Sequence, residues 1–228
     1  MIAARVISFD LDDTLWPVEP VIAAAEAELL SWIRLHHPQA ALGHDIGSMR
    51  SMRAIVAERF PEHSHDLTFV RRRALGEQFA AAGYRDAHSR DSPAEEAMQV
   101  FLAERNRVTF YEDVRPALQR LRRRYRLFAV SNGNADLGRC GIADLFQGHI
   151  NASTAGAAKP DARIFAHLLR AAGVRPAQVV HVGDDPLADV VGAMSAGLRA
   201  VWLNRDGRPW PVELAPPPRT VSTLAELL

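Results

Sequence analysis

The chain has 228 residues, with 27 Lys plus Arg balanced by 27 Asp plus Glu, and 48% of its residues are hydrophobic. This length suits one large domain, or a core with a smaller companion, and the apolar content is enough for a buried core. A formal net charge of zero argues against nucleic acid and membrane surfaces as main partners, because both select for a basic excess.

The cysteine content and the N-terminus bear on the compartment. The single cysteine, Cys140, excludes an internal disulfide and fits a reducing compartment. Asp10 interrupts the apolar residues at the N-terminus before they are long enough for a signal-peptide core. No apolar stretch of the chain is long enough to span a bilayer. We therefore expect a cytoplasmic protein, and its oligomeric state stays open at this stage.

The first part of the chain changes from a strand pattern to a helical one. Residues 5–9 (RVISF) form a short β-rich run, and we expect a strand that ends at acidic residues. The following region, 17–104, has apolar residues at helical spacing and no strand signal. Ser48 is a candidate N-cap within it, and Ser92 followed by Pro93 is another. The helices expected here cover residues 17–37, 47–60, 67–82 and 92–106.

From Tyr111 onward, helices and buried apolar strands alternate. Such alternation is typical of a doubly wound, Rossmann-like parallel sheet of the α/β class. We therefore expect a core made of residues 1–16 and 105–228, interrupted by an all-helical insertion at 17–104. The tail, 215–228, is expected to be coil followed by a terminal helix. Helices are expected at 112–125, 161–173 and 186–197, and strands at 126–134, 149–151, 177–185 and 198–204, with the 126–134 strand breaking into a polar turn.

Three of the expected strands end in polar clusters, FDLDDT, VSNGN and VGDD. The carboxyl ends of parallel strands lie at one edge of the sheet, which is where ligands bind. Asp10 and Asp12 point the same way if the strand continues, and Asp184 arrives from another strand. DLDD alone would also fit a solvated loop or a helix cap, but three clusters at one edge favour a site.

Carboxylates that converge need a cation, and oxygen ligands suit Mg²⁺. Lys159 supplies a fixed positive charge, Ser131 a hydroxyl, and the Asn132-Gly133 turn backbone N–H groups. A metal, a lysine, a hydroxyl and exposed amides together suit a dianion such as phosphate, with a carboxylate able to attack it. The arginine runs at 71–73 and 122–124 could bind an anion, but a solvated helix face is the expected place for them.

Four segments, FDLDDTL, VSNGN, KPDARIF and VGDDPLADVVGA, resemble the ordered motifs of the haloacid dehalogenase-like hydrolase superfamily. The resemblance spans the core from Val6 to about Leu203. The helical insertion resembles the type 1 helical cap of that superfamily. The opening motif, SNGNADL and HVGDDPLADVVGA are in addition similar to bacterial flavin mononucleotide phosphatases, which also act on 5-amino-6-(5-phospho-D-ribitylamino)uracil.

The resemblance implies a role for each matching residue. Asp10 would be the nucleophile that forms an aspartyl-phosphate, and Asp12 the general acid and base. Asp10, Asp12 and Asp184 would hold Mg²⁺, with Asp12 using its backbone carbonyl. Lys159 would hold both the phosphate and the nucleophile. The remaining implied roles are loop bracing or substrate binding for Thr14, phosphate binding for Ser131, Asn132 and Gly133, and support of the metal shell for Asp189.

The resemblance therefore implies a Mg²⁺-dependent phosphatase acting on a small phosphomonoester. A haloacid dehalogenase and a phosphomutase of the same fold are the alternatives, and a binding module that has lost activity is disfavoured by the full set of acids. The role of Asp185 stays open. Trp16 and Phe69 are candidates to stack on a substrate ring, and core packing is the alternative for Phe69.

Overall fold

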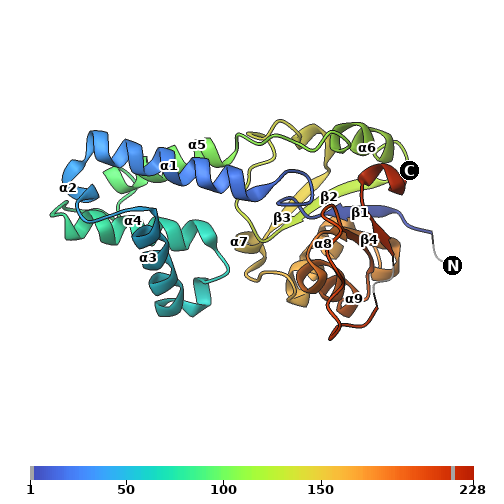
Figure 1. The fold of residues 1–228 in the computed structure, drawn as a ribbon. Helices are drawn as coiled ribbons and strands as arrows, with labels where there is room; N and C mark the ends of the chain where they lie inside the picture. Colours follow the sequence, from blue (N-terminus) through green and yellow to red (C-terminus); the bar gives the residue numbers. More distant parts are fainter. Residues whose placement is uncertain (1–2, 217–218) are drawn as a thin grey trace. The chain divides into compact units, whose positions relative to one another are not determined.

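The computed structural model describes residues 3–216 and 219–228 and divides the chain into two compact units (Figure 1). One unit consists of Met1–Pro17 and Thr109–Leu228 and contains the sheet. The other, Val18–Val108, is inserted between these two segments and is built from helices. The predicted α/β fold class with an all-helical insertion is thereby confirmed.

The sheet has six strands in the order β3-β2-β1-β4-β5-β6, and every neighbouring pair is parallel. The first strand, β1, lies in the interior of the sheet, with Phe9 beside Ala129 of β2 and Val182 of β4. Central parallel strands are covered on both faces, which explains the apolar run VISF, buried at all four positions. The strands are β1 Val6–Phe9, β2 Arg126–Ser131, β3 Gly148–Asn151, β4 Val179–Gly183, β5 Arg199–Leu203 and β6 Thr220–Val221.

Helices flank this sheet, with α6 on one side and α8 and α9 on the other (Figure 1). On the α8 side, Ile164, Phe165 and Leu168 pack with strand residues such as Val179 in one buried cluster. Gly173 ends α8 in the left-handed conformation, at φ 61°, as its position after an apolar helix predicts. The helices of this unit are α6 Val114–Leu121, α7 Ala152–Ala155, α8 Ala162–Ala172 and α9 Gly192–Ser195, with short 3₁₀ turns at Ala143–Leu145, Pro176–Gln178 and Leu224–Leu227.

Three expectations for this unit are corrected. The helix expected at 112–125 is shorter, because it ends as the arginine run 122–124 begins. The helix expected at 186–197 is a π-helical turn, Pro186–Val191, followed by α9. The tail was expected to be coil before its helix, but β6 pairs with β5 and only one 3₁₀ turn follows. Residues 217–218 of that tail lie outside the described residues.

The inserted unit begins with α1 and closes with α5, which pack side by side (Figure 1). Ser92 caps α5 by accepting a hydrogen bond from the Glu95 N–H at 3.2 Å, as predicted. Ser48 is not an N-cap, because Asp45 takes that position and Ser48 completes a reciprocal capping box three residues later. The helices are α1 Val18–His36, α2 Pro38–Ala41, α3 Ile46–Arg59, α4 Leu67–Ala81 and α5 Pro93–Arg105, with a 3₁₀ turn at Pro61–His63.

Among the described residues, none of the helices combines the length and the apolar character needed to cross a membrane.

The apolar stripe of α1 gives a stability prediction with a matched control on the same helix. Leu29 is fully buried against residues such as Met98 and Phe101 of α5, whereas Leu35 is 76% exposed. We expect Leu29→Ala to lower the free energy of unfolding by about 2–5 kcal/mol, because it removes buried methyl groups and leaves a cavity. Leu35→Ala should change it by less than about 0.5 kcal/mol. Urea unfolding followed by circular dichroism measures both, and equal effects would contradict this packing.

Candidate active site

The site is built at the carboxyl end of β1, where the strand leaves the interior of the sheet. The N–H of Asp10 still donates to the Val182 carbonyl at 2.9 Å, so this residue is held at the strand end by the sheet ladder. Asp10 is only 7% exposed. A carboxylate is therefore buried at a position where the neighbouring strands β2 and β4 also end.

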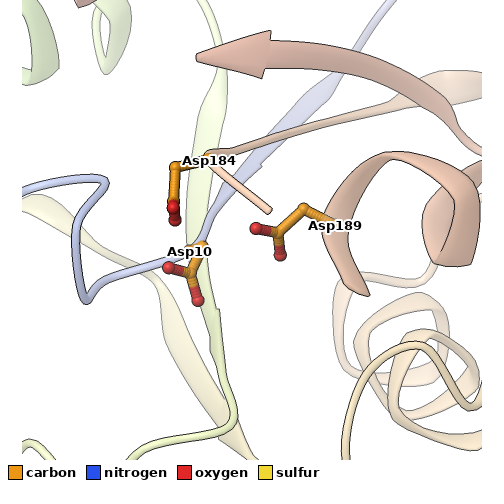
Figure 2. Close-up of side chains that lie close together, drawn as sticks. All are labelled: Asp10, Asp184 and Asp189. Carbon is orange, nitrogen blue, oxygen red and sulfur yellow. The ribbon is translucent and has the colours of Figure 1, made fainter. Parts of the chain in front are cut away.

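Three carboxylates converge there, those of Asp10, Asp184 and Asp189 (Figure 2). One oxygen from each lies within 4.8 Å of the others. Asp184 directly follows β4, and Asp189 comes from the π-helical turn behind it. Such turns are rare and are often found at functional sites. Asp189, expected only in a supporting position, is thus one of the three converging acids.

The buried side chain of Lys159 joins two of these acids. Its Nζ donates to Asp10 Oδ1, to Asp189 Oδ1 at 2.6 Å and to the Val130 carbonyl at 2.9 Å. Its backbone is fixed by Asn132, whose amide accepts from the Lys159 N–H at 2.7 Å and donates to its carbonyl at 2.9 Å. The Asn132 side chain, expected near substrate, therefore contacts the loop that carries the lysine.

Two further predicted residues lie at the ends of β2 and β1. Ser131 is buried, and its Oγ accepts a hydrogen bond from the Gly133 N–H at 2.9 Å. Because that oxygen is already an acceptor, its own O–H remains a donor for a ligand. Thr14 donates from Oγ1 to Asp184 Oδ1 at 3.3 Å, which ties the first loop to the β4 end.

Asp12 is held differently from the three converging acids. Its Oδ1 accepts a hydrogen bond from the Trp16 indole Nε1 at 2.9 Å. Trp16 is fully buried and packs edge-on against Phe110, with 5.6 Å between the ring centroids. The expectation that Trp16 stacks on a substrate ring is therefore wrong, because its ring lies in the core and its N–H orients Asp12.

Two acids beside the site have local roles. Asp185, whose role stayed open in the sequence, caps the π-helical turn by accepting hydrogen bonds from the N–H groups of Leu187 and Ala188 at 2.8 and 2.7 Å. Asp13 has a φ of 58°, and its N–H donates to the Trp16 carbonyl at 2.8 Å, which closes the turn after Asp12.

The three acids carry more negative charge than Lys159 can balance. Burial raises the pKa of Asp10 well above its usual range, and Asp189 and Asp184 raise it further while Lys159 opposes them. Burial also raises the pKa of Asp184 to about 6. For Asp189, burial would raise the pKa, but Lys159 and His181 outweigh it, and the pKa is lowered. A cation beside Asp10 and Asp184 would relieve this repulsion.

Two residues that the sequence analysis missed hold Asp184. Arg208 donates from Nη2 to Asp184 Oδ2 at 3.1 Å and to its backbone carbonyl at 3.2 Å. The Trp202 indole donates to the same carbonyl at 2.8 Å. Both belong to β5 or the loop after it, so no spacing within the β4 motif could have indicated them.

A second missed feature is a buried chain of hydrogen bonds behind Asp189. His181 Nε2 lies 3.1 Å from Asp189 Oδ1, and Nδ1 lies 2.8 Å from Ser8 Oγ. Burial lowers the pKa of His181, so its ring is neutral. A neutral ring that donates from Nε2 to the carboxylate must accept the Ser8 O–H at Nδ1. Gly183 leaves room for this, since a Cβ there would lie 2.2 Å from Asp189 Cγ.

This chain predicts one tautomer of His181. In ¹⁵N-labelled protein we expect a neutral ring protonated on Nε2 at pH 7–8, because burial lowers the pKa of His181. Ser8→Ala removes the donor to Nδ1 and should populate the second tautomer. Ser222→Ala, at an exposed serine, should leave the His181 nitrogen signals unchanged. Ordinary titration of the wild-type ring near its model-peptide pKa would contradict the assignment.

Comparison with known proteins places this geometry in a family. The family model "haloacid dehalogenase-like hydrolase" matches residues 4–197. The chain is 32% identical to 5-amino-6-(5-phospho-D-ribitylamino)uracil phosphatase YigB of Escherichia coli, over 86% of this chain and 82% of that protein. It is 39% identical to the phosphoserine phosphatase of Thermus thermophilus, over 54% of this chain and 52% of that protein.

A solved structure is also similar over nearly the whole chain. It is described as a 2-haloacid dehalogenase from Pseudomonas syringae, with a TM-score of 0.91 and 35% identity, covering 98% of this chain and 96% of that one. The chain therefore belongs to the haloacid dehalogenase-like hydrolases and is a hydrolase.

Proposed function

We propose that this chain is a Mg²⁺-dependent phosphatase that hydrolyses a small phosphomonoester through an aspartyl-phosphate on Asp10. The observation that carries the proposal is the position of Asp10, buried between Lys159 and two further carboxylates at the ends of the central strands. Lys159 contacts Oδ1 of Asp10, which leaves Oδ2 to act as the nucleophile. The inserted helical unit is proposed to serve as the cap that selects substrate.

The donor set fits a hard divalent cation. The converging ligand atoms are all carboxylate oxygens, the type that Mg²⁺ prefers. Burial raises the pKa of both Asp10 and Asp184, neighbouring carboxylates raise each further, and a cation would favour their ionised forms. We assign Asp10, Asp184 and the backbone carbonyl of Asp12 to the ion, with Asp189 in support. When bound, the ion offsets the repulsion between Asp10 and a phosphate dianion.

The proposed reaction has two steps. Asp10 attacks phosphorus, the ester P–O bond breaks, and Asp12 gives its proton to the departing alkoxide. Water next attacks the aspartyl-phosphate while Asp12 takes up its proton, which releases phosphate and restores the Asp10 carboxylate. The phosphoryl oxygens are held by Lys159, by the Ser131 O–H and by N–H groups of the turn at 132–133. Positioning and charge neutralisation supply most of the rate in such transfers.

The proposed role of Asp12 is supported by its contact with Trp16. The fully buried indole donates its N–H to one oxygen of the Asp12 carboxyl at 2.9 Å, which holds that oxygen in a defined position. General acid catalysis from such a group is worth about 10²–10⁴-fold in rate.

A haloacid dehalogenase is the second candidate, favoured by the name of the similar Pseudomonas syringae structure. It would use Asp10 to displace a halide from carbon, which requires no divalent cation. The three converging carboxylates favour the phosphatase, because their excess charge suits a metal and a phosphate dianion.

Removing the nucleophile gives the first functional prediction. Asp10→Asn should lower kcat by about 10⁴–10⁶-fold, since a nucleophile cannot be replaced by its neighbours. The variant should remain folded, because the Asn amide oxygen can still accept from Lys159 and Asp189 still pairs with that lysine. Asp144→Asn, at an acid with a 74% exposed side chain, is the control and should keep wild-type activity. Full turnover by Asp10→Asn in a phosphate-release assay would remove Asp10 as the nucleophile.

Magnesium binding should depend on pH through Asp184. Its pKa of about 6 exceeds the unfolded value near 4, so the metal-free folded chain keeps a proton there between about pH 4 and 6. That proton must leave when Mg²⁺ binds, so affinity should rise as pH rises through 6, and the raised pKa of Asp10, also assigned to the ion, adds to this rise. The same shift makes the metal-free protein less stable as pH rises through this window, since the folded state holds more protons.

Isothermal titration calorimetry of Mg²⁺ from pH 5 to 8 measures this dependence. Buffers of different ionisation enthalpy report the released proton, and Asp184→Asn should lower the number of protons released and remove most of the affinity. Phosphatase activity should be lost in EDTA and restored by Mg²⁺. Affinity that does not change with pH, or full activity in metal-stripped buffer, would contradict the assignment.

The substrate is tested with a panel compared by kcat/KM. It contains flavin mononucleotide, 5-amino-6-(5-phospho-D-ribitylamino)uracil, sugar phosphates, nucleotides and 2-haloacids. We expect the flavin-related phosphates to be hydrolysed best, in line with the similarity to YigB. Halide release from 2-haloacids would instead support the dehalogenase, and an isomeric sugar phosphate without free phosphate would indicate a phosphomutase.

A further inference from the structure

The inserted helical unit contains a buried ion cluster that shares no residue with the acid motifs. Glu26 of α1, with a 3% exposed side chain, accepts from Arg50 and Arg53 of α3 at 2.7 Å each, and from Arg71 of α4 at 3.4 Å. The expectation that the run 71–73 lies on a solvated face is therefore wrong for its first residue.

The helical period explains which arginine is buried. Arg71 shares the buried face of α4 with Ala74, Leu75 and Gln78, at the spacing of three, four and seven residues. Arg72 lies off that face, with a 48% exposed side chain, and pairs with Glu95 at 2.6 Å. The two neighbouring arginines are therefore a buried one and an exposed one on the same helix.

The cluster has more positive than negative charge. In the ion pairs of the cluster, Glu26 contacts three arginines, those at positions 50, 53 and 71. Burial first, and then repulsion by Arg53, lowers the pKa of Arg71 to about 9. Buried charge of one sign is costly unless it is compensated.

Arg71 also has an unused donor. Its Nη1 is buried and has no hydrogen-bond partner among the described residues, while the guanidinium carbon lies 3.5 Å from the Phe101 ring centroid. A buried N–H of a charged group without an acceptor costs free energy and calls for a ligand or a water. The guanidinium is therefore held against the Phe101 ring on one side, while its Nη1 lacks a hydrogen-bond acceptor among the described residues.

A small cavity lies against the same side chains. Arg53 and Arg71 line it together with apolar groups, and it has a volume of about 10 Å³ available to a water-sized group. Gln78, the other polar residue of the lining, already donates its amide to the Ala40 carbonyl at 2.7 Å. The cavity thus offers cationic donors, an apolar wall and room for a single atom of that size. The apolar part of the lining is Leu29, Met49, Met52, Ala74 and Leu75.

We propose that this cavity is an anion site, in which Arg71 and Arg53 hold one negative group of single-atom size. Each possible ligand would place one negatively charged atom in the cavity. That atom is either a free halide ion or one oxygen of the carboxylate of a small molecule. An anion adds the missing negative charge and an acceptor for Nη1, whereas water supplies only the acceptor. The apolar lining favours weakly hydrated ions, because a strongly hydrated ion loses more on transfer.

The test uses the full chain with bromide, whose anomalous scattering separates it from water. Crystals grown without halide and soaked in sodium bromide should show an anomalous peak within hydrogen-bond distance of Arg71 in the wild type. Arg71→Gln should lose that peak, and Arg72→Gln, the exposed neighbour, should keep it. A water in the cavity with no anomalous peak at saturating bromide would overturn the proposal.

Solution measurements separate the two ligand sources. At constant ionic strength, replacing sodium methanesulfonate by sodium bromide should raise Tm saturably in the wild type and in Arg72→Gln, and not in Arg71→Gln. Sodium acetate in place of bromide tests the carboxylate source. If Arg71→Gln does not fold, Arg71→Lys takes its place, and a weaker response to bromide is expected because the forked donor is lost. No response of the wild type to either anion would also overturn the proposal.

Discussion

The contact of Lys159 with two buried carboxylates is the interaction on which the core of this protein depends. Asp10 and Asp189 are both almost inaccessible to water, and their negative charges could not be kept there without a cation between them. The lysine is not free to move, because its Nζ also donates to the Val130 carbonyl and its backbone is clamped by Asn132. The Lys159 ammonium group is thus held by a main-chain carbonyl of β2 as well as by the two carboxylates.

The sheet order explains why such distant residues meet. The strand β1 has β2 on one side and β4 on the other, so all three end at the same edge. Asp10, Ser131 and Asp184 are the residues at or just beyond those three ends. Ligands of open α/β sheets bind at this edge, where the order of connections reverses. Further from the edge, Ser8 of β1 contacts His181 of β4, and His181 in turn contacts Asp189. The strands therefore also position Asp189 through side chains within the sheet.

Both units bury charge, and they do so with opposite signs. At the sheet edge three carboxylates converge and Lys159 contacts two of them, whereas in the helical unit three arginines contact Glu26. In each case the excess charge is costly in a medium of low dielectric, and it marks a place where a counterion fits. Buried ion pairs are weak evidence for stability. The unequal number of positive and negative groups in each cluster says more about the molecule, because it indicates where a counterion binds.

The sequence by itself determined the elements with strong local patterns and the identity of the acids. The apolar runs before Asp10 and Asp184 indicated buried parallel strands, and the cap formed by Ser92 and Pro93 began its helix as predicted. Local signals failed where long-range contacts decide the outcome. The strand β6 is only two residues long and exists through pairing with β5, and Asp45 took the cap position that the pattern gave to Ser48.

Only the tertiary structure decided which side chains share a buried space. Arg208 and Trp202 reach Asp184 from β5 and its loop, and His181 reaches Asp189 across the sheet interior. Trp16 proved to be a core residue that orients Asp12, and the buried position of Arg71 depends on the Glu26 carboxylate from another helix. Burial and pairing of charges are properties of neighbours in space. A one-dimensional pattern fixes the period of an element and the residues it carries, and folding decides what those residues face.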